Sequence, residues 1–124
     1  MLTLYKLFRA TIRRHDFIKV NDSVLVGVSG GVDSMVLAAL LLRLQKDIDF
    51  KLSLAHVNYG LRGKESDAQE KLVRDFAAKH GAPCFVTKGV GTTQAQAREF
   101  RYHYFAEAAA QIGRRRELLA VGDR

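Results

Sequence analysis

The sequence predicts an α/β protein, a doubly wound parallel sheet with helices on both faces. Two observations lead to this prediction. Short apolar runs rich in β-branched residues alternate along the 124-residue chain with segments of helical periodicity. Strands that alternate with helices form βαβ units, whose right-handed crossovers make the strands parallel and put helices on both sheet faces. The length fits one compact domain.

The N-terminal segment, residues 3–16, is predicted to be an amphipathic helix. Its apolar residues recur at helical spacing and are expected to face the core, whereas its basic residues fall mainly elsewhere on the helix. The apolar set is Leu4, Leu7, Phe8 and Ile12, and the basic set is Lys6, Arg9, Arg13 and Arg14.

The first two strands are predicted at residues 23–28 and 51–57, because both runs consist mostly of apolar or small residues. Residues 33–46 between them have the composition of a helix. A polar loop that contains glycines is expected over residues 58–66.

The rest of the chain predicts two more helices and two more strands. Ser66 or Asp67 is expected to cap a helix that runs to about His80, where Gly81 ends it. The inward face of this helix is expected to hold Leu72, Val73, Phe76 and Ala77. The later elements are a third strand at 84–87, a long helix at 94–112 ended by Gly113, and the start of a fourth strand at 118–121.

The most informative segment lies between the first strand and the next helix. It reads Ser29-Gly30-Gly31-Val32-Asp33-Ser34. Glycines let phosphate oxygens approach backbone N–H groups, and a helix N-terminus favours negative charge. The two serine hydroxyls can donate to phosphate or cap the helix. This segment therefore predicts a nucleotide-phosphate site, with a serine-capped glycine turn that binds no ligand as the alternative.

Asp33 is unusual in a phosphate loop, because a carboxylate repels phosphate unless a cation lies between them. We therefore expect Asp33 to be a Mg²⁺ ligand. The Walker A loop is excluded, since no lysine occurs between Lys19 and Lys46, and the glycine intervals do not fit the dinucleotide pattern either.

A second distinctive segment, residues 55–67, follows the second predicted strand and reads AHVNYGLRGKESD. The strand end around His56 can present groups to a purine edge, and Arg62 can neutralise phosphates or contact nucleic acid. The alternative is a solvated loop in which His56 is a satisfied strand-end histidine. Carboxyl ends of parallel strands share one edge of the sheet, so this segment and the glycine loop are expected to meet there.

Charge and cysteine content limit the class of protein. The formal net charge is +7 and the sequence pI is about 9.9, which favours polyanionic partners such as nucleotides or nucleic acid. Cys84 is the only cysteine, so no disulfide or cysteine-pair metal site forms within the chain. The apolar runs are too short to cross a bilayer. We therefore expect a cytoplasmic protein with no membrane partner.

Together these segments resemble a known family. SGGVDS resembles the pyrophosphate loop of the PP-loop (N-type) ATP pyrophosphatases. AHVNYGLRGKESDAQE and the later AREFRYHYF narrow the similarity to the tRNA(Ile)-lysidine synthetases. The similarity spans residues 20 to 113, and Tyr59 stands where the family usually has histidine.

The resemblance implies an adenine nucleotide alpha hydrolase-like fold and an ATP-dependent ligase. Such an enzyme adenylates the wobble cytidine of an isoleucine tRNA with a CAU anticodon, and free L-lysine then displaces AMP to give lysidine. ATP and Mg²⁺ are the implied cofactors. The implied site holds ATP at Ser29, Gly30, Gly31, Val32, Asp33, Ser34 and His56, with Asp33 also catalytic and metal-binding; Arg62, Arg98 and Arg101 are RNA candidates.

The family pattern continues beyond the fourth strand with a histidine pair and an acidic element that the chain lacks before Arg124. We therefore expect the N-terminal part of a PP-loop ligase domain, with residues 1–20 as a leading helix and 21–124 as an incomplete nucleotide-binding core. Such a part is expected to be inactive in isolation.

Two alternatives remain open at this point. One is another PP-loop adenylating enzyme that modifies tRNA, although a single cysteine disfavours the sulfur-transferring members. The other is a non-catalytic module that binds nucleotide or RNA. On α-helical geometry, Arg98 and Arg101 are close enough in sequence to share one face, and the alternative for them is an ordinary surface pair.

Overall fold

Three parallel strands in the order β1-β2-β3 form the sheet of the computed structural model, which describes residues 2–60, 63–89 and 93–111. The strands are β1 (Ser23–Gly27), β2 (Lys51–Asn58) and β3 (Cys84–Lys88). β2 is central, and Leu54 pairs with Val26 on one side and with Cys84 on the other. The predicted strand positions are therefore confirmed for the first three strands, while 118–121 lies outside the described residues.

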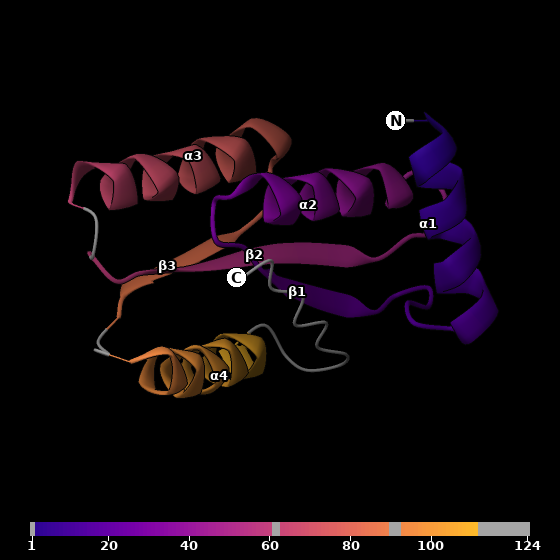
Figure 1. Cartoon of the computed structure of the whole chain (residues 1–124). Helices are drawn as coiled ribbons and strands as arrows, with labels where there is room; N and C mark the ends of the chain where they lie inside the picture. Colours follow the sequence, from indigo (N-terminus) through magenta and orange to yellow (C-terminus); the bar gives the residue numbers. More distant parts are fainter. Residues whose placement is uncertain (1, 61–62, 90–92, 112–124) are drawn as a thin grey trace.

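Helices cover both faces of this sheet (Figure 1). α2 (Val32–Leu44) and α3 (Lys64–His80) lie on one face, and α4 (Gln94–Gln111) lies on the other. α1 (Leu2–His15) packs across the end of the sheet near the C-terminus of α2. The parallel sheet with helices on both faces confirms the predicted fold class. Gly113, the predicted end of the last helix, lies outside the described residues.

Alternation along β2 divides the core into two layers. Leu52 and Leu54 join the larger cluster beneath α1, α2 and α3, whereas Ala55 and Val57 join a smaller cluster with Phe105 of α4. Every residue of β2 except Lys51 is buried, as expected for a central strand of a parallel sheet covered on both faces.

The predicted inward face of α1 is partly wrong. Leu4 and Leu7 are 46% and 64% exposed, whereas Tyr5 is 2% exposed and Ile12 is 5% exposed. Tyr5 is buried because its hydroxyl donates to the Asp47 carboxylate and its ring lies under the Arg43 guanidinium, 4.7 Å from the ring centroid. A polar anchor to the end of α2 thus sets the rotation of α1, and the spacing of leucines does not reveal it.

α3 begins earlier than the sequence suggests. Its first residue is Lys64 and its N-cap is Gly63, at φ +54°, so neither Ser66 nor Asp67 is the cap. Gly81 ends the helix in the left-handed conformation, as predicted. Val73 and Ala77 are buried and Phe76 packs against the core, but Leu72 is 48% exposed, so this part of the predicted face is wrong.

Candidate functional site

The glycine loop lies at the carboxyl end of β1, directly before α2. Val28 continues the pairing beyond β1, since its N–H donates to the Ala55 carbonyl at 2.8 Å. The chain then turns, and the first bond of α2 runs from Met35 N–H to the Gly31 carbonyl at 3.0 Å. The N–H groups of Val32, Asp33 and Ser34 precede that bond, so they belong to the unpaired positive end of the helix dipole.

The two serine hydroxyls shape the loop from within. Ser34 Oγ accepts from Ser29 N–H and donates to the Gly31 carbonyl, each at 3.1 Å. Ser29 Oγ accepts from Gly31 N–H at 3.2 Å and lies 3.2 Å from Ser34 Oγ. Helix capping by a serine is therefore wrong, because the N-cap residue is Gly31, which has no side chain that could cap the helix. The hydroxyls form a cross-brace that holds the turn in shape.

Gly30 has φ +89°, and the loop leans at this point against α3. A Cβ built on Gly30 would lie 2.9 Å from the Gln69 Cβ. Both the backbone conformation and the space therefore require glycine here. Gln69 is a contact that sequence reasoning missed, because no spacing rule connects α3 with the loop.

Asp33 is exposed in the first turn of α2, next to Val32, which is 79% exposed. Within residues 2–60, 63–89 and 93–111, no group of three or more His, Cys, Asp or Glu side chains gathers as a metal site. A single outward carboxylate fits Mg²⁺ nevertheless, because this ion commonly takes one or two carboxylates together with substrate phosphates and water.

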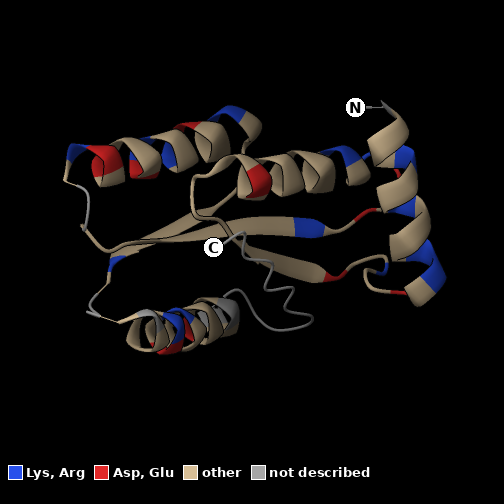
Figure 2. Ribbon diagram, in the orientation of Figure 1, with Lys and Arg blue, Asp and Glu red and all other residues tan. Residues whose placement is uncertain are grey.

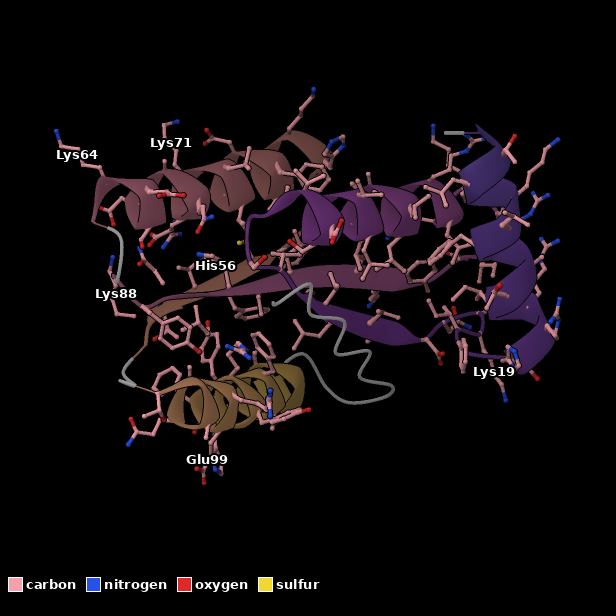
Figure 3. All side chains as sticks on the ribbon, in the orientation of Figure 1. Lys19, His56, Lys64, Lys71, Lys88 and Glu99 are labelled. Carbon is pink, nitrogen blue, oxygen red and sulfur yellow. The ribbon has the colours of Figure 1, made fainter. Side chains whose placement is uncertain are left out.

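His56 of β2 lies beside the start of the glycine loop and is 3% exposed (Figure 3). Its Nδ1–H donates to the Val28 carbonyl at 2.8 Å, because a carbonyl only accepts. This bond fixes the tautomer, so Nε2 carries the lone pair, and Nε2 has no partner among the described residues. Burial lowers the pKa of His56, with the Val28 bond acting in the opposite direction. His56 is therefore a neutral acceptor at pH 7.

The segment after β2 is fastened to α3 through Asn58, which is 2% exposed. Asn58 Nδ2 donates to Glu70 at 2.9 Å and to Asp67 at 3.1 Å, while its Oδ1 accepts from Gly60 N–H at 2.8 Å. The Asn58 and Arg74 hydrogen bonds lower the pKa of Glu70 to about 2. This anchor fixes where the segment leaves the sheet. Arg62 itself lies outside the described residues.

The two arginines of α4 differ in their surroundings. Arg98 is exposed, whereas Arg101 is half-buried and its Nη1 lies 3.4 Å from the Tyr59 hydroxyl. Both belong to the helix on the sheet face opposite α2 and α3. The structure thus brings His56 to the glycine loop and Arg101 to the segment after β2, but Arg98 contacts neither in any described bond.

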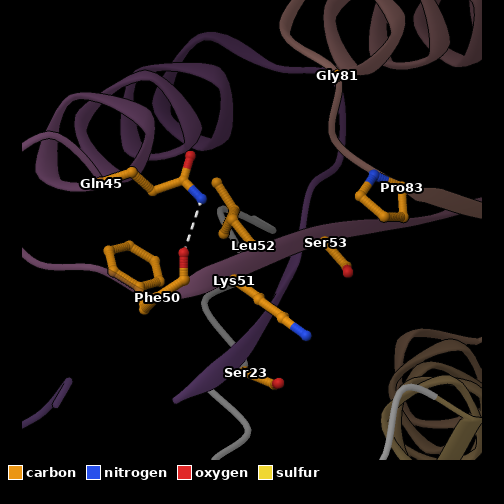
Figure 4. Close-up of a pocket in the computed structure, with 8 residues that line it drawn as sticks. All are labelled: Ser23, Gln45, Phe50, Lys51, Leu52, Ser53, Gly81 and Pro83. Atoms are coloured by element: carbon orange, nitrogen blue, oxygen red, sulfur yellow. Dashed lines mark hydrogen bonds between the residues drawn. The ribbon is translucent and has the colours of Figure 1, made fainter. Parts of the chain in front are cut away.

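A pocket of about 390 Å³ lies at the other end of the sheet, near the amino ends of the strands (Figure 4). Its polar groups include Lys51 and Ser53, and Gln45 Nε2 at its rim donates to the Phe50 carbonyl at 3.0 Å. The pocket and the glycine loop lie at opposite ends of the strands, so the pocket is not part of the candidate nucleotide site.

Basic side chains follow α1, while α3 carries both signs (Figure 2). In the part of the chain that the structure describes, no helix has the length and hydropathy needed to cross a bilayer.

Comparison with known proteins agrees with this geometry. The chain is 38% identical over 104 residues to the tRNA(Ile)-lysidine synthase of Clostridium tetani, covering 77% of this chain and 22% of the relative. It is 36% identical over 121 residues to that of Thermosipho africanus, covering 90% and 28%. The chain therefore spans about a quarter of the length of these relatives.

A solved structure supports the fold independently. The U34-tRNA thiolase NcsA from Methanococcus maripaludis, with its 4Fe-4S cluster, superposes with a TM-score of 0.69 at 24% identity, over 86% of this chain and 39% of that one. The family model described as a PP-loop domain matches residues 4–122. With the glycine loop at the carboxyl end of β1, this match shows that the chain belongs to the PP-loop domain family.

Proposed function

We propose that this chain supplies the ATP-binding part of a tRNA(Ile)-lysidine synthase. The observation that carries the proposal is the glycine loop at the carboxyl end of β1. This loop leads into the unpaired N–H groups of α2 and the exposed Asp33, and the buried His56 is bonded to Val28 directly before it. The similarity to the lysidine synthases, at 34–38% identity, gives the substrate class.

The proposed reaction has two steps. The C2 carbonyl oxygen of the wobble cytidine attacks the α-phosphorus of ATP, and the bond to pyrophosphate breaks. The neutral ε-amine of free L-lysine then attacks C2, AMP leaves, and lysidine forms. Adenylation is needed because a cytosine carbonyl oxygen is a poor leaving group, whereas AMP is a good one.

The residues of the glycine loop are proposed to bind the phosphates of ATP. The N–H groups at the start of α2 face the negative charge, and the serine cross-brace holds them in place before ATP binds. Asp33 is proposed to hold Mg²⁺, which would offset the charge that develops on the phosphates.

His56 is proposed to accept a hydrogen bond from the nucleotide. A buried acceptor without a partner costs about 1–3 kcal/mol, so a ligand N–H or O–H that reached Nε2 would recover that free energy. Arg62, Arg98 and Arg101 are proposed to contact the phosphates of an isoleucine tRNA with a CAU anticodon.

The whole reaction is proposed for the protein at the length of its relatives, because the aligned part is only about a quarter of them. Within it, we propose residues 1–20 as the leading helix and 21–124 as part of the nucleotide-binding core. We propose that the 124 residues alone form no lysidine, and we place the reaction in the cytoplasm because tRNA and ATP are its substrates.

The test of this function is Asp33→Asn. We expect the substitution to abolish Mg²⁺-dependent ATP binding by the chain, measured by isothermal titration, because an amide carries no charge for the ion. The matched control is Asp75→Asn, since Asp75 is an exposed carboxylate of α3 paired only with Lys71 among the described bonds.

The same pair of variants also tests catalysis. In the protein at relative length, pyrophosphate release with isoleucine tRNA, ATP and labelled lysine is expected to stop in Asp33→Asn and to continue in Asp75→Asn. Unchanged release in Asp33→Asn would remove Asp33 from the metal site. Failure of the unsubstituted chain to bind ATP would remove the proposed function as a whole.

A further inference from the structure

Tyr59 is the first residue after β2, and its side chain lies on the opposite face of the sheet from that of Asn58. Asn58 bonds to α3, whereas Tyr59 packs in the smaller core cluster beneath α4. Two consecutive side chains therefore hold the segment after β2 to helices on both faces of the sheet. Nothing in the glycine loop itself requires this second attachment.

The surroundings of Tyr59 are closely fitted to its ring. Phe100 meets the ring edge-on, with centroids 6.3 Å apart and the planes at 67°. Gly89 lies against the other side, where an added Cβ would come within 2.6 Å of the Tyr59 Cε1. The ring is thus in contact with both Gly89, the residue after β3, and α4, and its hydroxyl reaches the α4 backbone.

Two of the described hydrogen bonds join this hydroxyl to α4, one helical turn apart. It donates to the Ala97 carbonyl at 2.8 Å, and Arg101 Nη1 donates to it at 3.4 Å. Because the first bond uses the only hydroxyl hydrogen, the oxygen lone pairs face the guanidinium. Holding this donor narrows the range of directions that the long Arg101 side chain can take.

We infer that Tyr59 is a positioning residue, which holds the Arg101 guanidinium and the first turns of α4 in a fixed relation to the segment after β2. The ligand class is a nucleic-acid phosphate at Arg101, and this part rests on the proposed function. In this role Tyr59 touches neither ATP nor RNA, and its effect on RNA binding passes through Arg101.

The experiment is Tyr59→Phe, which keeps the ring and removes the hydroxyl. In the protein at relative length, we expect KM for an isoleucine tRNA transcript to rise about 5-fold, while KM for ATP stays within 2-fold. Tyr5→Phe is the matched control, because it also removes a tyrosine hydroxyl bond, to Asp47, at the far end of the sheet. This control is expected to leave both constants unchanged.

A double substitution separates positioning from general weakening. Arg101→Gln is expected to raise KM for tRNA by at least the same factor, and Tyr59→Phe added to Arg101→Gln is expected to raise it no further. An equal rise of both KM values in Tyr59→Phe, or fully independent effects in the double variant, would overturn the inference.

A readout independent of RNA keeps the two proposals apart. NMR nitrogen relaxation of the Arg101 guanidinium in the chain is expected to report greater mobility in Tyr59→Phe than in Tyr5→Phe. Unchanged mobility would overturn the positioning role of Tyr59. Greater mobility together with unchanged tRNA affinity of Arg101→Gln would instead overturn the proposed RNA contact.

Discussion

At the scale of single residues, glycine is required at position 30 for two separate reasons. Its φ of +89° is costly for a residue with a Cβ, and the space that a Cβ would occupy is filled by Gln69. The second requirement couples the glycine loop to α3, so the shape of the loop depends on a helix from which α2 and β2 separate it in the sequence.

Gly30→Ala is expected to lower the free energy of unfolding by about 2–3 kcal/mol, from backbone strain and the close contact together. ATP affinity is expected to fall at least about 10-fold, because relief of the contact moves the loop N–H groups. Urea denaturation and isothermal titration measure the two effects.

The control for this prediction is Gly81→Ala, at φ +69° with nothing within 4 Å of the added Cβ. It isolates backbone strain, so its cost is expected to be about 1–2 kcal/mol, with ATP affinity unchanged. An equal loss of stability in both variants would show that the Gln69 contact contributes nothing.

The sequence could predict which residues form the glycine loop, but not how they are braced. SGGVDS between a strand and a helix indicates a turn with free N–H groups. That Ser34 Oγ bonds to the Ser29 backbone, that Ser29 Oγ bonds to the Gly31 backbone, and that Gly31 is the N-cap depend on hydroxyl directions that no spacing encodes. The roles of these residues toward ATP stay predictions.

At the scale of elements, α3 is fixed to the strand ends by charge. Glu70 accepts hydrogen bonds from Asn58 and Arg74 at 2.9 Å each, and Lys88 of β3 lies 3.4 Å away. One carboxylate thus joins β2, β3 and α3. The Glu70 side chain is 17% exposed, so water screens its bonds less than it screens the exposed Lys71–Asp75 pair of α3.

The sign of the pH dependence follows from the lowered pKa of Glu70. Glu70 binds a proton less readily in the folded state than in the unfolded state, where its pKa has the ordinary value of 4.5. The stabilisation is therefore present above pH 4.5 and is lost as pH falls towards about 2.

Glu70→Gln is expected to lower the free energy of unfolding at pH 7 by about 1–3 kcal/mol, because the charge that accepts these bonds is gone. The variant is also expected to lose less stability than the unsubstituted protein as pH falls from 4.5 to about 2. Urea denaturation followed by circular dichroism measures this. Asp75→Asn, which removes a carboxylate that is 64% exposed, should leave the acid profile intact. A profile in Glu70→Gln that still falls over this range would assign the effect to another group.

The alternation of apolar runs and helical periodicity predicts where the elements lie in the sequence. It does not predict which face of each helix is buried. α1 turns Tyr5 inward and Leu7 outward because Asp47 and Arg43, about forty residues away, hold the phenol. α3 starts at Lys64, and the Asp67 carboxylate, which the sequence suggested as a cap, accepts a bond from Asn58 of β2. Both differences involve polar bonds to residues outside the helix itself, which local periodicity does not contain.

At the scale of the whole molecule, the net charge of +7 is distributed over several elements. Basic side chains lie along α1 and occur on α3 and α4, with acidic neighbours on the last two. A distributed positive charge attracts a polyanion over a distance, but only the side chains that pair with phosphates release counterions.

The affinity of the chain for an isoleucine tRNA transcript is expected to fall with salt, with a log–log slope of about −2 to −3 if three side chains pair with phosphates. Arg98→Gln is expected to reduce the slope by about 0.7–0.9, because one contact is lost. Filter binding over a range of salt concentrations measures this. Lys71→Gln, which removes a charge paired with Asp75, serves as the control, and a slope near zero would contradict an RNA partner.

α4 is the last described element, yet it packs on the first strands of the sheet. Phe105 is 2% exposed and lies against Gly27, where an added Cβ would be 2.5 Å from the Phe105 Cε2. This contact joins residues far apart in the sequence, so α4 gains its main support only after β1 and β2 have paired. During synthesis the glycine loop and α3 leave the ribosome before α4 does. The sheet face covered by α2 and α3 can therefore fold first. The opposite face keeps its apolar surface exposed, where chaperones can bind, until Phe105 packs against it.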